Sequence, residues 1–121
     1  MEDKTYYEHR DKAKIFYKNL KEIPCAVLDN EYIEFGNAGF QHLLKKGRYP
    51  RTKSDQIRRF LLLKYVPNII KDPNVSIVCL EDKTACFWRI TKRIEKQIIK
   101  VIIRQFPGEN KHFFSVMNNK K

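Results

Sequence analysis

The sequence predicts an α+β fold in which N-terminal helices pack on a four-stranded antiparallel sheet. Up to residue 73, apolar side chains recur every three or four positions, which is typical of helices that bury one face. From residue 75 onward they alternate with polar ones at a period of two, which is typical of strands. We therefore expect one domain over residues 1–121, with a helical part at 1–73 and a sheet part at 75–117.

The first predicted helix covers residues 5–21 and ends before Pro24. Its apolar side chains gather on one face: Tyr6, Ala13, Phe16, Tyr17 and Leu20. Two short apolar runs follow on either side of Asn30. They indicate either a hairpin or a strand with its edge.

Two more helices are predicted before residue 73. The segment "FQHLLKKG" is long enough for two helical turns, and Gly47 is expected to end it as a C-terminal cap. The segment "SDQIRRFLLLKYVPNIIKDP" has apolar residues three and four apart, with Thr52 or Ser54 as its N-terminal cap. Pro67 is expected to kink or split this helix, because a proline inside a helix removes a hydrogen bond.

Four runs are predicted as strands: "VSIVCLE", "ACFWRITKRIE", "QIIKVIIRQF" and "HFFSVMN". Short loops join them, which favours an antiparallel meander because a parallel crossover needs about a dozen residues. In the third run, Lys100 and Arg104 share one face with Ile98 and Ile102, and the opposite face is the drier one. We expect the face with the two cations to be a concave, partly covered surface.

The net charge of +11 is unevenly distributed along the chain. Residues 1–35 hold six Lys and Arg against eight Asp and Glu, so the basic excess belongs to residues 36–121. Such a charge favours polyanions, because each neutralised phosphate releases condensed counterions. The alternative is a basic protein without a polyanionic partner, whose many lysines reflect the codon usage of an AT-rich genome. Nucleic acid or an anionic membrane surface is therefore the expected partner if the charge has a binding role.

Membrane, metal and cofactor roles are not expected. No apolar run approaches the roughly 20 residues of a membrane span, and the N-terminus lacks a hydrophobic signal core. The three cysteines have no zinc-binding spacing and lie in apolar runs, where we expect buried, reduced thiols. These features favour action in the cytoplasm.

Several polar residues suit the cleavage of RNA without a metal. This reaction needs a base for the 2′-hydroxyl proton, cations for the phosphorus centre and an acid for the leaving 5′-oxygen, roles that fit histidine and arginine. The candidate catalytic residues are His42, Arg104, His112 and Ser115. The candidate substrate-binding residues are Lys45, Lys46, Arg48, Arg51 and Thr91.

Each candidate also has a structural interpretation. His42 and His112 fit a structural or surface histidine, and Arg104 fits an ordinary cation on a sheet face. A buried Ser115 hydroxyl needs a hydrogen-bond partner, which need not be a phosphate. The basic run after His42 fits a solvated surface.

Three segments resemble the phage-type branch of the Barnase–EndoU–colicin–RelE (BECR) nuclease superfamily. They are "HLLKKGRYPRTKSDQIRRFLLLKYVPNIIKDP", "FWRI" and "VIIRQFPGENKHFFSV", and the resemblance covers roughly residues 39–117. It implies a BECR-like fold, with helices before a four-stranded antiparallel sheet, and the activity of an RNA-cleaving toxin.

The resemblance also implies roles for particular residues. The helical histidine of the family corresponds to His42, its basic strand residue to Arg104, and its terminal "hFxS" pattern to "HFFS", which ends at Ser115. Neighbouring families have a second histidine or a threonine, for which His112 and Thr91 are the candidates here.

The leading hypothesis is thus a metal-independent endoribonuclease toxin that cuts tRNA or other RNA to a 2′,3′-cyclic phosphate. An acidic immunity or antitoxin protein is expected to neutralise it. Such a toxin is either free-standing or delivered from another cell as part of a larger polypeptide. Two alternatives stay open: a non-catalytic nucleic-acid-binding module, including a helix-turn-helix over residues 40–72, and a basic protein-interaction adaptor.

Overall fold

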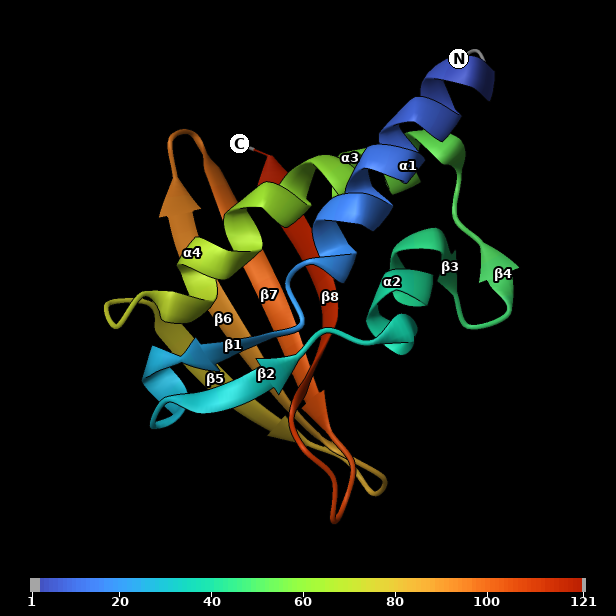
Figure 1. Ribbon diagram of the computed structural model, residues 1–121. Helices are drawn as coiled ribbons and strands as arrows, with labels where there is room; N and C mark the ends of the chain where they lie inside the picture. Colours follow the sequence, from blue (N-terminus) through green and yellow to red (C-terminus); the bar gives the residue numbers. More distant parts are fainter. Residues whose placement is uncertain (1–2, 121) are drawn as a thin grey trace.

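The computed structural model describes residues 3–120 and has an α+β architecture (Figure 1). Its helices are α1 (Asp3–Lys18), α2 (Asn37–Leu44), α3 (Lys53–Leu62) and α4 (Val66–Lys71), with 3-10 turns η1 (Ala26–Leu28) and η2 (Leu63–Tyr65). Its strands are β1 (Glu22–Cys25), β2 (Glu31–Glu34), β3 (Lys45–Lys46), β4 (Tyr49–Pro50), β5 (Ser76–Glu81), β6 (Cys86–Ile94), β7 (Gln97–Gln105) and β8 (His112–Lys120).

The main sheet is mixed and six-stranded, in the order β1-β2-β8-β7-β6-β5. The predicted four-stranded antiparallel sheet is therefore wrong, although β5 to β8 do form the antiparallel meander that the short loops indicated. Residues on either side of Asn30 form a hairpin, β1–β2, which joins β8 through one parallel pairing of Glu34 with His112. A single pairing between residues so far apart has no local signal in the sequence.

The predicted boundary between a helical part at 1–73 and a sheet part at 75–117 also needs correction. Strands β1 to β4 lie within the first part, and β8 runs on to Lys120. Gly47 does not cap α2: with φ +60 it turns the small β3–β4 hairpin. Met1, Glu2 and Lys121 lie outside the described residues.

The long helix predicted after residue 54 is split, as expected from Pro67. Thr52 caps α3, because its Oγ1 accepts the backbone N–H of Asp55 at 3.1 Å. The turn η2 then separates α3 from α4, and Pro67 lies in the first turn of α4, where its missing N–H costs no hydrogen bond.

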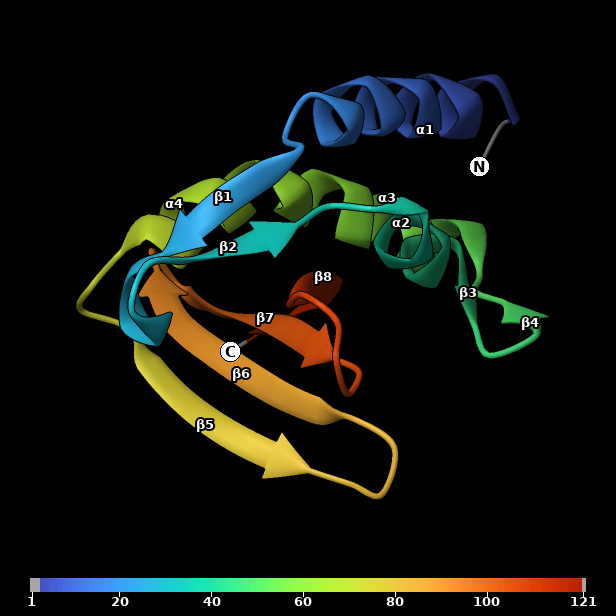
Figure 2. The same cartoon turned by 60° about the horizontal axis from the view of Figure 1, so that its bottom comes forward.

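One face of the sheet carries the helices, and the sheet curls beneath them (Figure 2). Helix α1 lies outermost, over α3. Ile99, Val101 and Ile103 of β7 are fully buried on the helix side, which confirms the predicted drier face. Lys100 and Arg104 point to the opposite face and are half-buried.

Helix α3 covers the part of the β8 edge that β2 leaves unpaired. Because β2 pairs only with the first residue of β8, the following backbone groups need other partners. The guanidinium of buried Arg59 donates to the Val116 carbonyl at 3.0 Å and to Ser115 Oγ at 3.1 Å. Asp55 accepts from Arg59 at 3.3 Å and holds it in place.

Helix α2 approaches β8 closely at Gly39. A Cβ at this position would lie 2.6 Å from the Phe113 carbonyl oxygen, which is far inside van der Waals contact. The Tyr17 hydroxyl donates to the Gly36 carbonyl at 2.7 Å and fixes the start of the helix. The absence of a side chain at Gly39 therefore sets the distance between α2 and the sheet.

We predict that Gly39→Ala lowers the free energy of unfolding by about 2 kcal/mol, because the clash outweighs the better helix propensity of alanine. Gly36→Ala is the matched control: its Cβ meets no atom within 4 Å, so we expect a change within about 0.5 kcal/mol. Urea unfolding of both variants measures the difference. Equal stabilities would contradict the close approach.

Candidate functional site

Two adjoining cavities form a cleft between α2 and the ends of β7 and β8. The first has a volume of about 360 Å³ and is lined by His42, Lys45 and Phe114 among others. The second has a volume of about 520 Å³ and is lined by His112 and by the first turn of α2. Arg104 lines both cavities, so it lies at the centre of the cleft.

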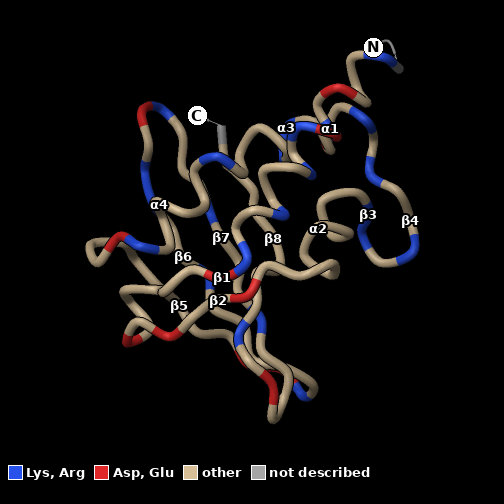
Figure 3. Tube along the Cα trace, viewed as in Figure 1, with Lys and Arg blue, Asp and Glu red and all other residues tan. Residues whose placement is uncertain are grey.

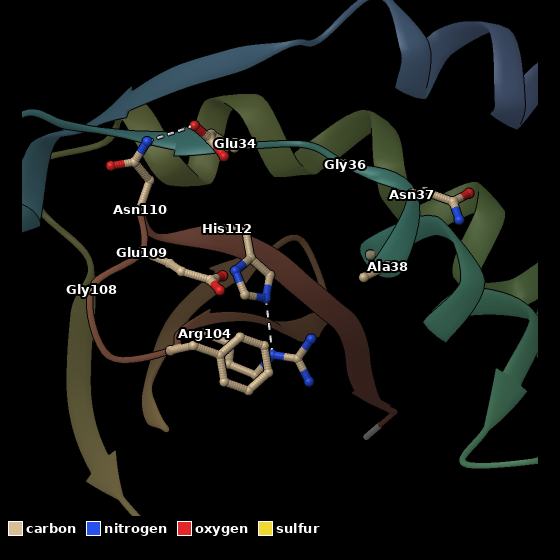
Figure 4. A pocket seen from close by; sticks show the side chains of 11 residues that line it. Glu34, Gly36, Asn37, Ala38, Arg104, Gly108, Glu109, Asn110 and His112 are labelled. Carbon is tan, nitrogen blue, oxygen red and sulfur yellow. Dashed lines mark hydrogen bonds between the residues drawn. The ribbon is translucent and has the colours of Figure 1, made fainter. Parts of the chain in front are cut away.

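Arg104 is held between two aromatic rings. Its guanidinium carbon lies 4.5 Å from the ring centre of Phe106 and 4.2 Å from that of Phe114. Its Nε donates to Nε2 of His112 at 2.9 Å (Figure 4). Burial lowers its pKa, but a guanidinium stays charged at neutral pH. The terminal nitrogens point away from His112, and no acceptor among the described residues takes their hydrogens.

A β-bulge directs Phe114 into the cleft. Ile102 pairs with Ser115 and Ile103 pairs with Phe113, so Phe114 is the extra residue of β8. The alternation predicted for this strand fails here, because Phe113, Ser115 and Val116 are all buried. The ring of Phe114 contacts Arg104 and, at a centroid distance of 4.1 Å, the ring of His42.

His42 lies on α2 and is neutral at pH 7. Burial, together with the nearby cations Arg51, Arg59 and Arg104, lowers the pKa of its imidazole to about 4. Its Nδ1 is buried without a hydrogen-bond partner among the described residues. His42 can therefore accept a proton, and a bound anion would increase its affinity for that proton.

His112 begins β8 and lies on the other side of Arg104 from the first cavity. Burial lowers its pKa, the charge of Arg104 lowers it further, and a hydrogen bond to the backbone of Asn110 and the carboxylate of Glu109 raise it. Because a guanidinium only donates, Nε2 of His112 is the acceptor and the neutral ring carries its proton on Nδ1. Glu109 lines the same cavity (Figure 4).

Ser115, Arg51 and Thr91 do not line the cleft. Ser115 is 1% exposed and its hydroxyl is bonded to Arg59, which favours the structural interpretation. Arg51 donates to the His42 carbonyl at 3.0 Å and pairs with Asp55, so it anchors the end of α2. Thr91 pairs across the sheet with Lys100, four positions along β7 from Arg104.

The basic residues that follow His42 in the sequence do not all lie at the cleft. Lys45 lines the first cavity. Lys46 and Arg48 are exposed on the β3–β4 hairpin, outside both cavities, and Arg48 lies over the ring of Tyr49. Only Lys45 is therefore in reach of a phosphate bound at Arg104.

Phe106, Phe114 and Glu109 belong to the cleft but were not identified from the sequence. Phe106 follows Arg104 by two positions, the spacing of side chains on one face of a strand, and this signal was available. Phe114 is the extra residue of a bulge, which strict alternation along a strand does not predict. Glu109 lies in a loop, where periodicity says nothing.

Within residues 3–120, no group of three or more His, Cys, Asp or Glu side chains is arranged to hold a metal ion. Cys25 is buried but Cys79 is exposed, so the expectation of three buried thiols is wrong. No helix in this range is long and apolar enough to cross a membrane.

Comparisons with known proteins gave no family. No family model matches the sequence, and neither a curated protein nor a solved structure does so. The case for any function therefore rests on the cleft around Arg104 and on the resemblance of the three sequence segments.

Proposed function

We propose that this protein is a metal-independent endoribonuclease of the toxin type, with its active site at Arg104. The observation that carries the proposal is the arrangement of the cleft: His42 lines one cavity, His112 lines the next, and Arg104 lines both. A phosphodiester bound at Arg104 would thus have an imidazole on each side. In-line displacement at phosphorus needs a base and an acid on opposite sides.

The reaction assigns one step to each group. Neutral His42 accepts the proton of the 2′-hydroxyl, and the 2′-oxygen forms a bond to phosphorus. The bond from phosphorus to the 5′-oxygen breaks, and protonated His112 gives its proton to that oxygen. The products are a 2′,3′-cyclic phosphate and a 5′-hydroxyl. Arg104 stabilises the additional negative charge on the phosphate oxygens.

The hydrogen bond between Arg104 and His112 supports this assignment. In the free protein Arg104 donates to the nitrogen of His112 that the acid role requires. A phosphate that accepts from Arg104 would free this nitrogen for a proton, and its negative charge would raise the pKa of His112. Substrate binding would therefore favour the protonated form of His112, which the general acid requires.

The start of α2 adds to the attraction for a phosphate. Gly36 precedes the helix and provides no side-chain cap, so the first backbone N–H groups of α2 have no side-chain acceptor there. These residues line the second cavity together with Arg104. A helix N-terminus favours anions through these groups and its dipole.

The toxin class follows from the resemblance to the BECR superfamily. In this proposal the β5–β8 meander with its helices is the BECR-like core, and the β1–β2 hairpin is an addition to its edge. A cognate immunity or antitoxin protein with an acidic surface would neutralise the enzyme by covering the cations of the cleft. tRNA or another cellular RNA would be the substrate.

We predict that the purified protein cleaves RNA in the presence of EDTA and leaves 2′,3′-cyclic phosphate ends. His42→Ala and His112→Ala should each lower kcat by about 10² to 10⁴, because each removes a proton-transfer group. His9→Ala is the matched control, since His9 lies on α1 and lines neither cavity. Cleavage is followed on labelled RNA, with the ends mapped by mass spectrometry.

Two outcomes would contradict the proposal in different ways. Undiminished cleavage by either histidine variant would remove that residue from the mechanism. Binding of RNA with strong salt dependence, but without cleavage by the unmodified protein, would identify the non-catalytic nucleic-acid-binding module instead.

The two histidines also predict an acidic optimum for kcat/KM. His42 must be neutral, which holds above its pKa of about 4, whereas His112 must be protonated, which holds below a pKa that lies under 6.5. We therefore expect kcat/KM to be highest between the two pKa values and to fall about tenfold per pH unit above the pKa of His112. A profile that rises from pH 6 to pH 8 would contradict the assignment.

A further inference from the structure

A third cavity lies between α1 and the start of α2, next to the cleft. Its volume is about 250 Å³, and its walls include the rings of Tyr17, Phe35 and Phe40. Three lysines complete its lining: Lys14, Lys18 and Lys21. No Asp or Glu side chain lines it. This cavity therefore combines three positive charges with an apolar interior.

The lysines converge because of the way α1 ends. Lys14 and Lys18 are four positions apart and share one face of the helix. Lys21 follows the helix with φ +52, a left-handed conformation that is rare for lysine. Its carbonyl accepts the backbone N–H of Phe35 at 2.8 Å, which holds it beside the entrance to α2.

The three amines are not neutralised by the protein. Among residues 3–120, no carboxylate lies within ion-pair distance of Lys14, Lys18 or Lys21. In Figure 3 the lower end of α1 shows basic residues close to the segment that leads into α2. A bound anion would reduce the mutual repulsion of these charges.

The third cavity adjoins the second one at Gly36 and Asn37, which line both. Gly36 is exposed, its φ of −105 suits any residue, and a Cβ there would meet no atom within 4 Å. Neither packing nor backbone conformation therefore requires glycine at this point. A side chain at Gly36 would instead stand in the passage between the two cavities.

We propose that the third cavity binds phosphates of the RNA strand beyond the one that is cut. The strand would extend from Lys45, past Arg104, over Gly36, to the lysines of α1. The preferred substrate is then an unpaired RNA segment of several nucleotides. This inference rests on the proposed function, because it takes Arg104 as the position of the scissile phosphate.

Lysines near the C-terminal end of a helix also offset its dipole, and Lys18 lies in the last turn of α1. That role needs no cavity, does not involve Lys21 beyond the helix, and does not depend on the residue at position 36. Binding measurements with charge and steric variants separate the two roles.

The test uses 2′-O-methyl RNA, which has no 2′-hydroxyl and is not cleaved, as a labelled ten-nucleotide and a labelled three-nucleotide strand. In the triple variant Lys14→Gln/Lys18→Gln/Lys21→Gln, we expect affinity for the longer strand to fall between about tenfold and 100-fold. The slope of log affinity against log salt should decrease by about 2, as expected for three lost phosphate contacts on a single strand. Affinity for the short strand should change less than about twofold.

The charge-matched control is Lys64→Gln/Lys71→Gln/Lys96→Gln, three exposed lysines that line none of the three cavities. It should weaken binding of the longer strand less than about threefold. A second variant, Gly36→Val, changes no charge and should weaken binding of the longer strand, with only a small decrease in melting temperature because valine is a poorer N-cap residue than glycine. Equal losses in the two triple variants, or no effect of Gly36→Val, would overturn the inference.

These results are independent of cleavage. If the unmodified protein cuts RNA but the two triple variants bind alike, the ribonuclease proposal stands and the extended strand path does not. If the expected binding pattern is found but no RNA is cut, the path stands and the catalytic role of the cleft is lost.

Discussion

The contact between Gly39 of α2 and Phe113 of β8 determines the geometry of the cleft. Because Gly39 has no side chain, the helix lies directly against the strand, and the Phe113 backbone leads into the bulge at Phe114. That bulge brings one aromatic ring into contact with both His42 and Arg104. The same short helix lines the second cavity with its first turn. A small displacement of α2 would therefore move His42 away from Arg104 and His112, which lie on paired strands.

The electrostatics of the cleft would favour a bound anion. Burial keeps the imidazole of His42 neutral, and the nearby cations Arg51, Arg59 and Arg104 contribute to this. Asp55 accepts hydrogen bonds from Arg51 and Arg59. Arg59 also closes the open edge of β8, so the residues that stabilise the fold and those that lower the pKa of His42 overlap. A phosphate in the cleft would reduce the repulsion and raise the proton affinity of His42. In the proposed function, ligand binding, fold stability and protonation would thus be coupled at this position.

Much of the fold was predictable from local patterns, and the remainder depends on contacts that such patterns do not encode. The period of two in β7 predicted which face is buried, and Pro67 predicted the break between α3 and α4. The parallel pairing of Glu34 with His112 joins distant segments at one residue and leaves no periodic signal. The bulge at Phe114 is an irregularity of one residue. The net charge of residues 1–35 conceals the lysines of α1, because no described carboxylate of that segment lines the third cavity. His42 and Arg104 do line one cavity, as the hypothesis from sequence requires.

The central claim is that one phosphate lies between His42 and His112 at Arg104, and an NMR titration of the imidazoles tests it most directly. The chain has three histidines, so each ring signal can be assigned, and His9 on α1 serves as an internal reference. In the free protein we expect His42 to titrate near pH 4 and His112 below 6.5. With a saturating 2′-deoxy trinucleotide, which is not cleaved, both values should rise, whereas the ring signals of His9 should not respond to the ligand. An increase for only one of the two rings, or for neither, would contradict a shared phosphate site.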